Sequence, residues 1–385
     1  MLQIPNKVVH FIKLYALLVV SCAFSFQTYG QHHQALWNRI ASCFHPPVYL
    51  KNSYGNYRPL LRFYNGDTVL TKRAWKQRRA EIANTWNQMM GPWPPLIRTQ
   101  KMEVLDTVRR TGFTQYRIRF NWTSTEKTIA YLCVPGLKGR LPAVITTFYE
   151  PETAIGKGKP NRDFAFQLAK RGYVTLSLGT AEASKAGTYS VYYPSVENAT
   201  VAPLSMLAYT AANAWYLLSG LPYVDDRRIG IMGHSFGGKW AMFASCLFDK
   251  FACAVWSDPG VVFDDTRGSA VNYWEPWYLG YYPPPWKDAW RKRGNTADAK
   301  GLYPKLIREG YDLHEIMALM APRPFLVSGG SSDPVDRWTA LNQVVRVNSL
   351  LGYTSRVAMT NRPGHDPNDE SNEIAYLFFD YFLKK

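Results

Sequence analysis

The sequence predicts an α/β fold in which a mostly parallel central sheet carries helices on both faces. Strand-like and helix-like segments alternate from residue 142 onward, and one short apolar strand runs directly into a glycine-rich turn and a further helix. Apolar residues make up 46% of the 385 residues. That share is enough to bury a core on both faces of one sheet.

The N-terminal residues 1–30 predict a secretory signal peptide. A basic start precedes an apolar stretch from Leu14 to Phe26 that is short for a membrane span, and Thr28–Tyr29–Gly30 supplies a cleavage site. We therefore expect a secreted or periplasmic protein, cleaved after Gly30. A lipoprotein whose Cys22 carries the lipid is the alternative, and no other segment is long and apolar enough to cross a membrane.

The net charge and the cysteines indicate which ligands and cofactors to expect. The formal net charge is +16 at pH 7, but no nucleic-acid-binding motif accompanies it, so we expect no nucleic-acid partner. Cys43, Cys133, Cys246 and Cys253 have mostly apolar neighbours and no metal-ligand spacing. We expect mostly buried thiols, with one disulfide left open, and neither a metal nor an organic cofactor.

Residues 31–114 predict an extension that packs on the core. Apolar residues recur at helical spacing from Trp75 to Met90, and Gly91–Pro92 ends the helix. We expect this helix to lie across the main domain and to be anchored by its tryptophans.

The catalytic domain is predicted over residues 115–385. An antiparallel pair, residues 115–120 and 127–134, opens the sheet because the first of these segments alternates polar and apolar side chains. Apolar strands then alternate with helices at residues 143–148, 162–171, 173–178, 202–220, 251–256, 324–328 and 355–359. Ligands of such sheets bind beyond the carboxyl ends of the strands.

A long irregular insertion at residues 258–311 interrupts this alternation, between the strand that ends near Trp256 and the helix that starts near Asp312. Insertions of this length are usually lids or binding loops. Its aromatic side chains predict a platform for a sugar, with packing onto the body as the alternative. The candidate substrate-binding residues are Trp274, Trp277, Tyr278 and Trp286.

The segment Gly233–His234–Ser235–Phe236–Gly237 predicts a nucleophilic serine. It follows an apolar strand and precedes a helix, and the glycines permit a sharp turn that exposes the hydroxyl of Ser235. The backbone N–H of Phe236 would then point at a developing oxyanion.

The candidate general base and the acid that would orient it lie in loops that follow later strands. His365 lies in a loop between the last strand and the last helix, and it is the best-placed histidine. Asp333 follows the strand at 324–328 and is the preferred acid, with Asp258 and Asp336 as alternatives.

The order Ser235, Asp333, His365 resembles the α/β-hydrolase superfamily over about residues 115–385. Within it the chain is similar to secreted acetyl xylan esterases and dienelactone-hydrolase-like proteins, and the glucuronoyl esterases are near relatives. Glucuronoyl esterases place arginine after the serine, where this chain has Phe236. The resemblance also implies Tyr149 as a second oxyanion donor, through its backbone N–H or its hydroxyl.

We therefore expect a secreted serine esterase that cleaves an ester, with acetyl as the preferred acyl group, on a plant-type polysaccharide through an acyl-enzyme. One rival is a peptidase of the prolyl oligopeptidase type, although residues 31–115 are too short for the propeller of those enzymes. A glucuronoyl-type esterase and a glycan-binding protein without activity are the other rivals.

Overall fold

The computed structural model describes residues 30–31, 33–264, 273, 275, 277–279 and 301–384. The predicted signal peptide, apart from Gly30, and the candidates Trp274 and Trp286 lie outside the described residues. Among the helices that are described, none combines the length and hydropathy needed to span a bilayer.

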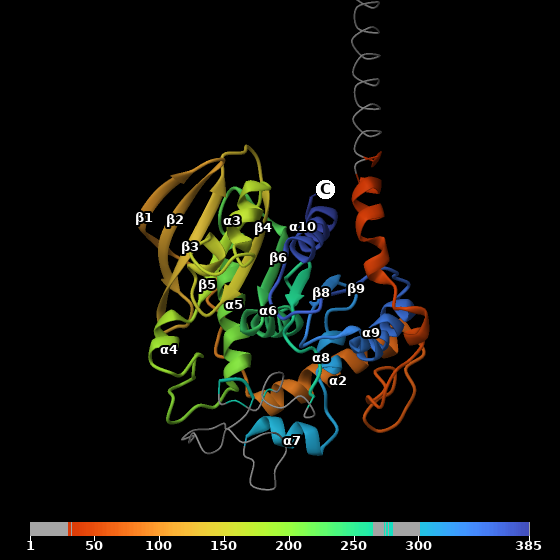
Figure 1. Ribbon diagram of the computed structural model, residues 1–385. Coiled ribbons are helices and arrows are strands. Elements are labelled where there is room, and N and C mark those ends of the chain that lie inside the picture. Colours follow the sequence, from red (N-terminus) through yellow and green to blue (C-terminus); the bar gives the residue numbers. More distant parts are fainter. Residues whose placement is uncertain are drawn as a thin grey trace, which may run out of the picture.

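The described residues form one nine-stranded sheet in the order β1-β2-β3-β5-β4-β6-β7-β8-β9 (Figure 1). The strands are β1 (Met102–Arg110), β2 (Phe113–Asn121), β3 (Lys127–Pro135), β4 (Leu141–Phe148), β5 (Val174–Gly179), β6 (Val224–His234), β7 (Ala254–Ser257), β8 (Phe325–Gly329) and β9 (Val357–Asn361). Strands β1, β2, β3 and β5 pair antiparallel in that order, and every pair from β5 to β9 is parallel. The mostly parallel sheet is as predicted.

Strand β1 adds a partner to the predicted antiparallel pair. The sequence predicted a pair at residues 115–120 and 127–134, which lie in β2 and β3, and β1 pairs with β2 from Met102. This edge strand is mostly exposed and carries charged side chains, which deter edge pairing with other molecules. It therefore lacks the alternation of apolar and polar residues by which a half-buried strand is detected.

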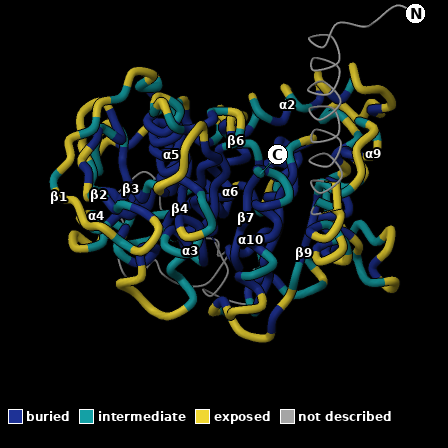
Figure 2. Tube along the Cα trace, turned by 90° about the horizontal axis from the view of Figure 1, so that it is seen from above, coloured by how far each residue is buried: buried dark blue, intermediate teal, exposed yellow. Residues whose placement is uncertain are grey.

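Helices cover both faces of the sheet, and alternate side chains of the strands supply the two cores. In β4, Ala143 and Ile145 pack into one hydrophobic cluster and Val144 into the other. The central strands and the helices beside them are the most deeply buried part of the molecule (Figure 2). The first face carries α5 (Pro203–Ser219), α6 (Phe236–Leu247), α8 (His314–Ala318) and α9 (Trp338–Leu351), and the second carries α3 (Phe164–Lys170) and α10 (Asp369–Leu383).

The N-terminal extension contacts both cores. Helix α2 (Lys72–Met90) buries Trp75 and Trp86 in the first cluster, and the indole N–H of Trp86 donates to Glu315 of α8 at 2.9 Å. Helical residues 33–40 and the 3₁₀ turn η1 (Ala41–Phe44) pack against α10, where Phe44 contacts Phe378. The anchoring of α2 by tryptophans agrees with the sequence prediction.

Shorter elements complete the described chain. The loops hold η2 (Val48–Leu50), η3 (Thr153–Ile155), α4 (Ala181–Lys185) and η6 (Val335–Arg337), and α7 (Leu302–Arg308) lies at the C-terminal end of the insertion. The four described cysteines are buried and free, as most of them were expected to be.

Candidate active site

Ser235 sits on a strained turn between β6 and α6. Its backbone adopts φ 55° and ψ −116°, a conformation that side chains rarely take. The turn is possible because a Cβ added at Gly237 would lie 1.8 Å from the carbonyl oxygen of Thr147, and one at Gly233 would lie 2.2 Å from that of Gly237. The two glycines thus let the turn around Ser235 pack directly against β4.

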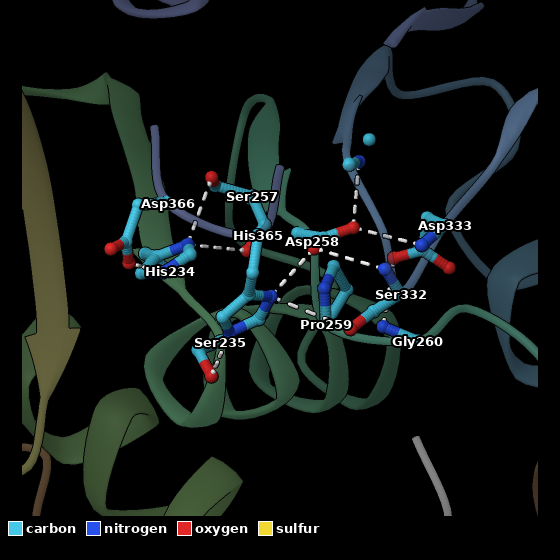
Figure 3. A network of polar contacts seen from close by, with 12 residues as sticks. His234, Ser235, Ser257, Asp258, Pro259, Gly260, Ser332, Asp333, His365 and Asp366 are labelled. Carbon is cyan, nitrogen blue, oxygen red and sulfur yellow. Dashed lines mark hydrogen bonds and ion pairs between the residues drawn. The ribbon is translucent and has the colours of Figure 1, made fainter. Parts of the chain in front are cut away.

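Three side chains form a chain of hydrogen bonds at the carboxyl ends of the parallel strands (Figure 3). Nε2 of His365 lies 2.8 Å from Oγ of Ser235, and Nδ1 of His365 lies 2.6 Å from Oδ2 of Asp258. A carboxylate can only accept a hydrogen bond, so the proton of the imidazole belongs on Nδ1 and Nε2 is free to accept from the serine.

The preference for Asp333 as the partner of His365 is therefore wrong, and the alternative Asp258 takes that place. The reason is register: His234 of β6 pairs with Ser257 of β7, so the residues that follow them leave the sheet at the same level. Asp258 thereby reaches the imidazole, whereas Asp333 lies on the far side of Asp258 (Figure 3).

Asp258 is held as an ionised acceptor. The residue is 1% exposed, and its carboxylate accepts backbone N–H bonds from Gly330, Ser332 and Asp333 at 2.7 to 3.1 Å. Burial works to raise the pKa of Asp258, but the hydrogen bonds from His365 and from these N–H groups hold that pKa below its ordinary value. An ionised Asp258 can orient the ring of His365 and stabilise it as an imidazolium.

Asp333 has a structural position instead. Its carboxylate accepts the backbone N–H groups of Gly260 and Val261 at 2.7 and 2.6 Å, at the start of the insertion. Burial, and then the charge of Asp258, raise the pKa of Asp333 to about 6. The third candidate acid, Asp336, is exposed in η6.

Arg362 ties the loop of His365 to the strand ends, and sequence reasoning missed it. The buried guanidinium donates to the carbonyl oxygens of His365 at 2.6 Å and Asp366 at 2.8 Å, both in the loop after β9. It also donates to the carbonyl oxygen of Ser328 at 2.8 Å and to Oγ of Ser257 at 3.3 Å, at the ends of β8 and β7. An arginine just before a loop histidine was the only signal in the sequence.

His234, the residue before the nucleophile, is buried against Ser257 and not directed at the serine hydroxyl (Figure 3). Burial, followed by the charges of His365 and Arg162, lowers its pKa to about 3. It is therefore a neutral packing group beneath His365, whose ring centroid lies 4.7 Å away.

The two predicted oxyanion donors lie side by side. The ring of Tyr149, which follows β4, stacks on the ring of Phe236 with 4.3 Å between centroids. The Tyr149 side chain is hydrogen-bonded to Tyr278. The backbone N–H of Phe236 belongs to the first turn of α6, where N–H groups have no acceptor within the helix.

Of the predicted sugar-binding residues, two can be placed. Tyr278 is buried, and its ring centroid lies 6.0 Å from that of Phe236, so it packs against the turn that carries Ser235. Trp277 is half-buried and contacts Tyr189 at 4.8 Å between ring centroids. Tyr189, which also contacts Tyr149 at 5.9 Å, was not singled out from the sequence, where it is one tyrosine among 25.

Within the described part of the chain, no three His, Cys, Asp or Glu side chains are grouped as a metal site requires. What the geometry offers is a nucleophile, a base and an orienting acid beside a helix N-terminus. That set of groups suits acyl transfer.

A strained serine after one parallel strand, with a histidine and an acid on loops after other strands of the same sheet, defines a class: the protein has the α/β-hydrolase fold, as the sequence predicted. Residues 210–347 match the model of the prolyl oligopeptidase family (peptidase family S9). No curated protein sequence matches the chain significantly.

Solved structures extend the similarity to most of the chain. A glucuronoyl esterase from Solibacter usitatus is 17% identical with a TM-score of 0.63, over 85% of this chain and 98% of that one. A promiscuous esterase of family CE15 from a marine bacterial metagenome is 16% identical with a TM-score of 0.65, over 85% and 97%. A putative acetyl xylan esterase from Bacteroides fragilis is 15% identical with a TM-score of 0.55, over 87% and 82%. At these identities the similarity establishes the fold.

Proposed function

We propose that this protein is a serine hydrolase that cleaves a carboxylic ester carried by a carbohydrate. The observation that supports the proposal most directly is the hydrogen-bonded set Ser235, His365 and Asp258, with 2.8 and 2.6 Å between the bonded atoms. The solved structures named above are carbohydrate esterases, which supports the choice of an ester substrate.

In the proposed reaction, Oγ of Ser235 attacks the acyl carbon while Nε2 of His365 takes the hydroxyl proton. The N–H of Phe236, together with the backbone N–H of Tyr149, stabilises the oxyanion. The ester C–O bond then breaks, and His365 returns the proton to the leaving alcohol. Water attacks the acyl-enzyme by the same route, which releases the acid and restores the serine.

An acetyl ester is the preferred substrate. The residue after the nucleophile is Phe236, which is fully buried in a stack with Tyr149. No guanidinium is therefore supplied from the position at which the resembling glucuronoyl esterases carry arginine. The match to glucuronoyl esterase structures supports a uronate ester as the second candidate.

The test compares the mature protein with its Ser235→Ala variant on acetylated xylan and on methyl glucuronate. We expect acetate release that the substitution reduces at least a thousandfold, because the residual activity of such variants comes from binding and the oxyanion hole alone. If the protein cleaved only methyl glucuronate, the proposed substrate would become a uronate ester in place of an acetyl ester. Inactivity on both esters, with no labelling of Ser235 by a fluorophosphonate, would refute the proposal.

The match to the prolyl oligopeptidase family makes a peptidase the remaining alternative. A panel of proline-containing peptides, assayed beside the esters, separates the two. Faster cleavage of the peptides would reverse the assignment.

A further inference from the structure

A cavity opens on the same edge of the sheet as Ser235. It has a volume of about 1190 Å³ and is walled by the β2–β3 hairpin, by residues 150–152 after β4, and by residues 179–197 around α4. We call it the side cavity. In Figure 1 its wall α4 lies at the left of the molecule, below β2, β3 and β5.

The side cavity adjoins the proposed oxyanion site. Strands β4 and β5 end in register, Phe148 opposite Gly179, and Glu150, a lining residue, follows Tyr149 directly. The ring contact between Tyr149 and Tyr189 lies at this boundary, because Thr188 and Ser190 also line the cavity. A ligand bound at Ser235 would have to extend past Tyr149 toward β3 to reach the side cavity.

The size of the side cavity exceeds what the ester itself needs. Sites for compact small molecules span roughly 300 to 1000 Å³. An acetyl group fills a small part of such a volume, so the side cavity suits an extended ligand.

The charges that line the side cavity favour an uncharged ligand. The chain as a whole carries +16, but the lining has four basic and five acidic side chains, so its net charge is −1. Polyanions gain little from such a mixed surface, whereas hydroxyl groups can donate to the carboxylates and accept from the cations. The charged lining residues are Arg117, Arg119, Lys127, Lys185, Glu126, Glu150, Glu152, Glu182 and Glu197.

Trp122 adds an unused donor. Its side chain lines the side cavity, is 7% exposed, and has an indole N–H that meets no acceptor among the described residues. Buried tryptophans usually find a partner for this N–H. The nitrogen itself is covered, so a ligand hydroxyl would accept from it once the indole ring shifts toward the cavity.

We propose that the side cavity is a binding subsite for the uncharged backbone of the polysaccharide that bears the ester. The inference rests on the proposed function for the ester, but the binding of the backbone can be measured without catalysis. Oligosaccharides of six sugars, with xylohexaose as the neutral probe and hexagalacturonate as the anionic one, are long enough to enter it.

Binding is measured by calorimetry on the Ser235→Ala protein. We expect xylohexaose to bind and hexagalacturonate to bind at least tenfold more weakly. Trp122→Phe, which removes the N–H and keeps an aromatic ring, should weaken xylohexaose binding about three- to tenfold. Equal or tighter binding of hexagalacturonate would overturn the choice of ligand, and the absence of binding by either probe would overturn the subsite.

A second variant avoids dependence on the buried Trp122. Ala183→Trp places a large side chain on the cavity wall, and Ala80→Trp, on an exposed position of α2, is the matched control. The ratio of kcat/KM on acetylated xylo-oligosaccharide to that on an aryl acetate should fall at least tenfold in Ala183→Trp and stay unchanged in Ala80→Trp. An unchanged ratio in both variants would refute the subsite.

The two proposals fail in different ways. If Ser235→Ala protein binds xylohexaose but the unmodified protein cleaves no ester, the subsite stands and the esterase proposal falls. If esters are cleaved but Ala183→Trp alters neither the ratio nor the binding, the esterase stands and the subsite falls.

Discussion

The backbone N–H of Asp333 donates a 2.8 Å hydrogen bond to the carboxylate of Asp258, so two buried acids from neighbouring strand ends lie side by side. Asp258 faces His365, and Asp333 faces the backbone of Gly260 and Val261. Asp258 is thus placed to orient the proposed base, while Asp333 fixes the loop that carries Asp258. This arrangement makes their roles separable by mutation.

Asp258→Asn should lower kcat by about a thousand- to ten-thousandfold, because the amide no longer stabilises the imidazolium of His365. Asp333→Asn should leave kcat within about tenfold and lower the free energy of unfolding by about 1–3 kcal/mol, since one of two backbone N–H groups loses its acceptor. Ester kinetics give kcat for both variants, and chemical denaturation gives their free energies of unfolding. A large kcat loss in Asp333→Asn with little loss in Asp258→Asn would return the acid role to Asp333.

Arg362 is expected to act as a positioning residue. Arg362→Gln should lower kcat about 10- to 100-fold and leave KM within about threefold, because a small displacement of His365 costs rate more than binding. Arg362→Lys should recover part of the loss, since an ammonium group still donates three hydrogen bonds. Titration of active sites with a fluorophosphonate corrects for unfolded protein. A rise in KM at constant kcat would contradict a role in positioning.

Gly237→Ala should abolish activity and soluble expression. The added Cβ would lie 1.8 Å from a backbone oxygen of Thr147, at a contact that neither backbone can relieve by a side-chain rotation. Gly136→Ala is the matched control, because a Cβ there meets no atom within 4 Å. Expression yield and melting temperature give the comparison, and a Gly237→Ala protein as stable as the control would contradict the packing described.

His314 should make stability depend on pH. Its Nε2 donates to the carbonyl oxygen of Arg58 at 2.8 Å, and burial lowers its pKa from 6.5 to about 4. Between these values the unfolded chain binds a proton that the folded chain does not, so the free energy of unfolding should fall as pH drops from 6.5 to 4. The loss attributable to His314 is about 3 kcal/mol, from 1.36 kcal/mol per pKa unit.

His314→Gln isolates this effect, because glutamine can still donate to Arg58 but does not titrate. Denaturation curves at several pH values should show a weaker loss of stability at low pH for the variant than for the unmodified protein. His45→Gln, at an exposed position, is the control. Parallel pH dependence of the unmodified protein and His314→Gln would refute the prediction.

Local pattern was sufficient to predict the central sheet and the turn around Ser235, and it led to His365 as the proposed base. Apolar strands alternating with helices specify a parallel sheet with two covered faces, and Gly-x-Ser-x-Gly after such a strand specifies the turn around Ser235. The pattern becomes β-like at Met102, but β1 was not predicted as a separate strand, because an exposed edge strand lacks the alternation of buried and exposed side chains.

The sequence by itself determined which residues leave the carboxyl ends of the strands, since that depends on short-range periodicity and turn chemistry. Only the tertiary structure decided which of them meet. The register between β6 and β7 brings Asp258 to His365, and the loop after β8 wraps Asp258 so closely that a Cβ at Gly330 would lie 2.8 Å from its carboxylate. Arg362 and Tyr189 likewise acquire their positions from contacts between segments that are distant in the sequence. Such contacts produce no periodic pattern from which they could be predicted.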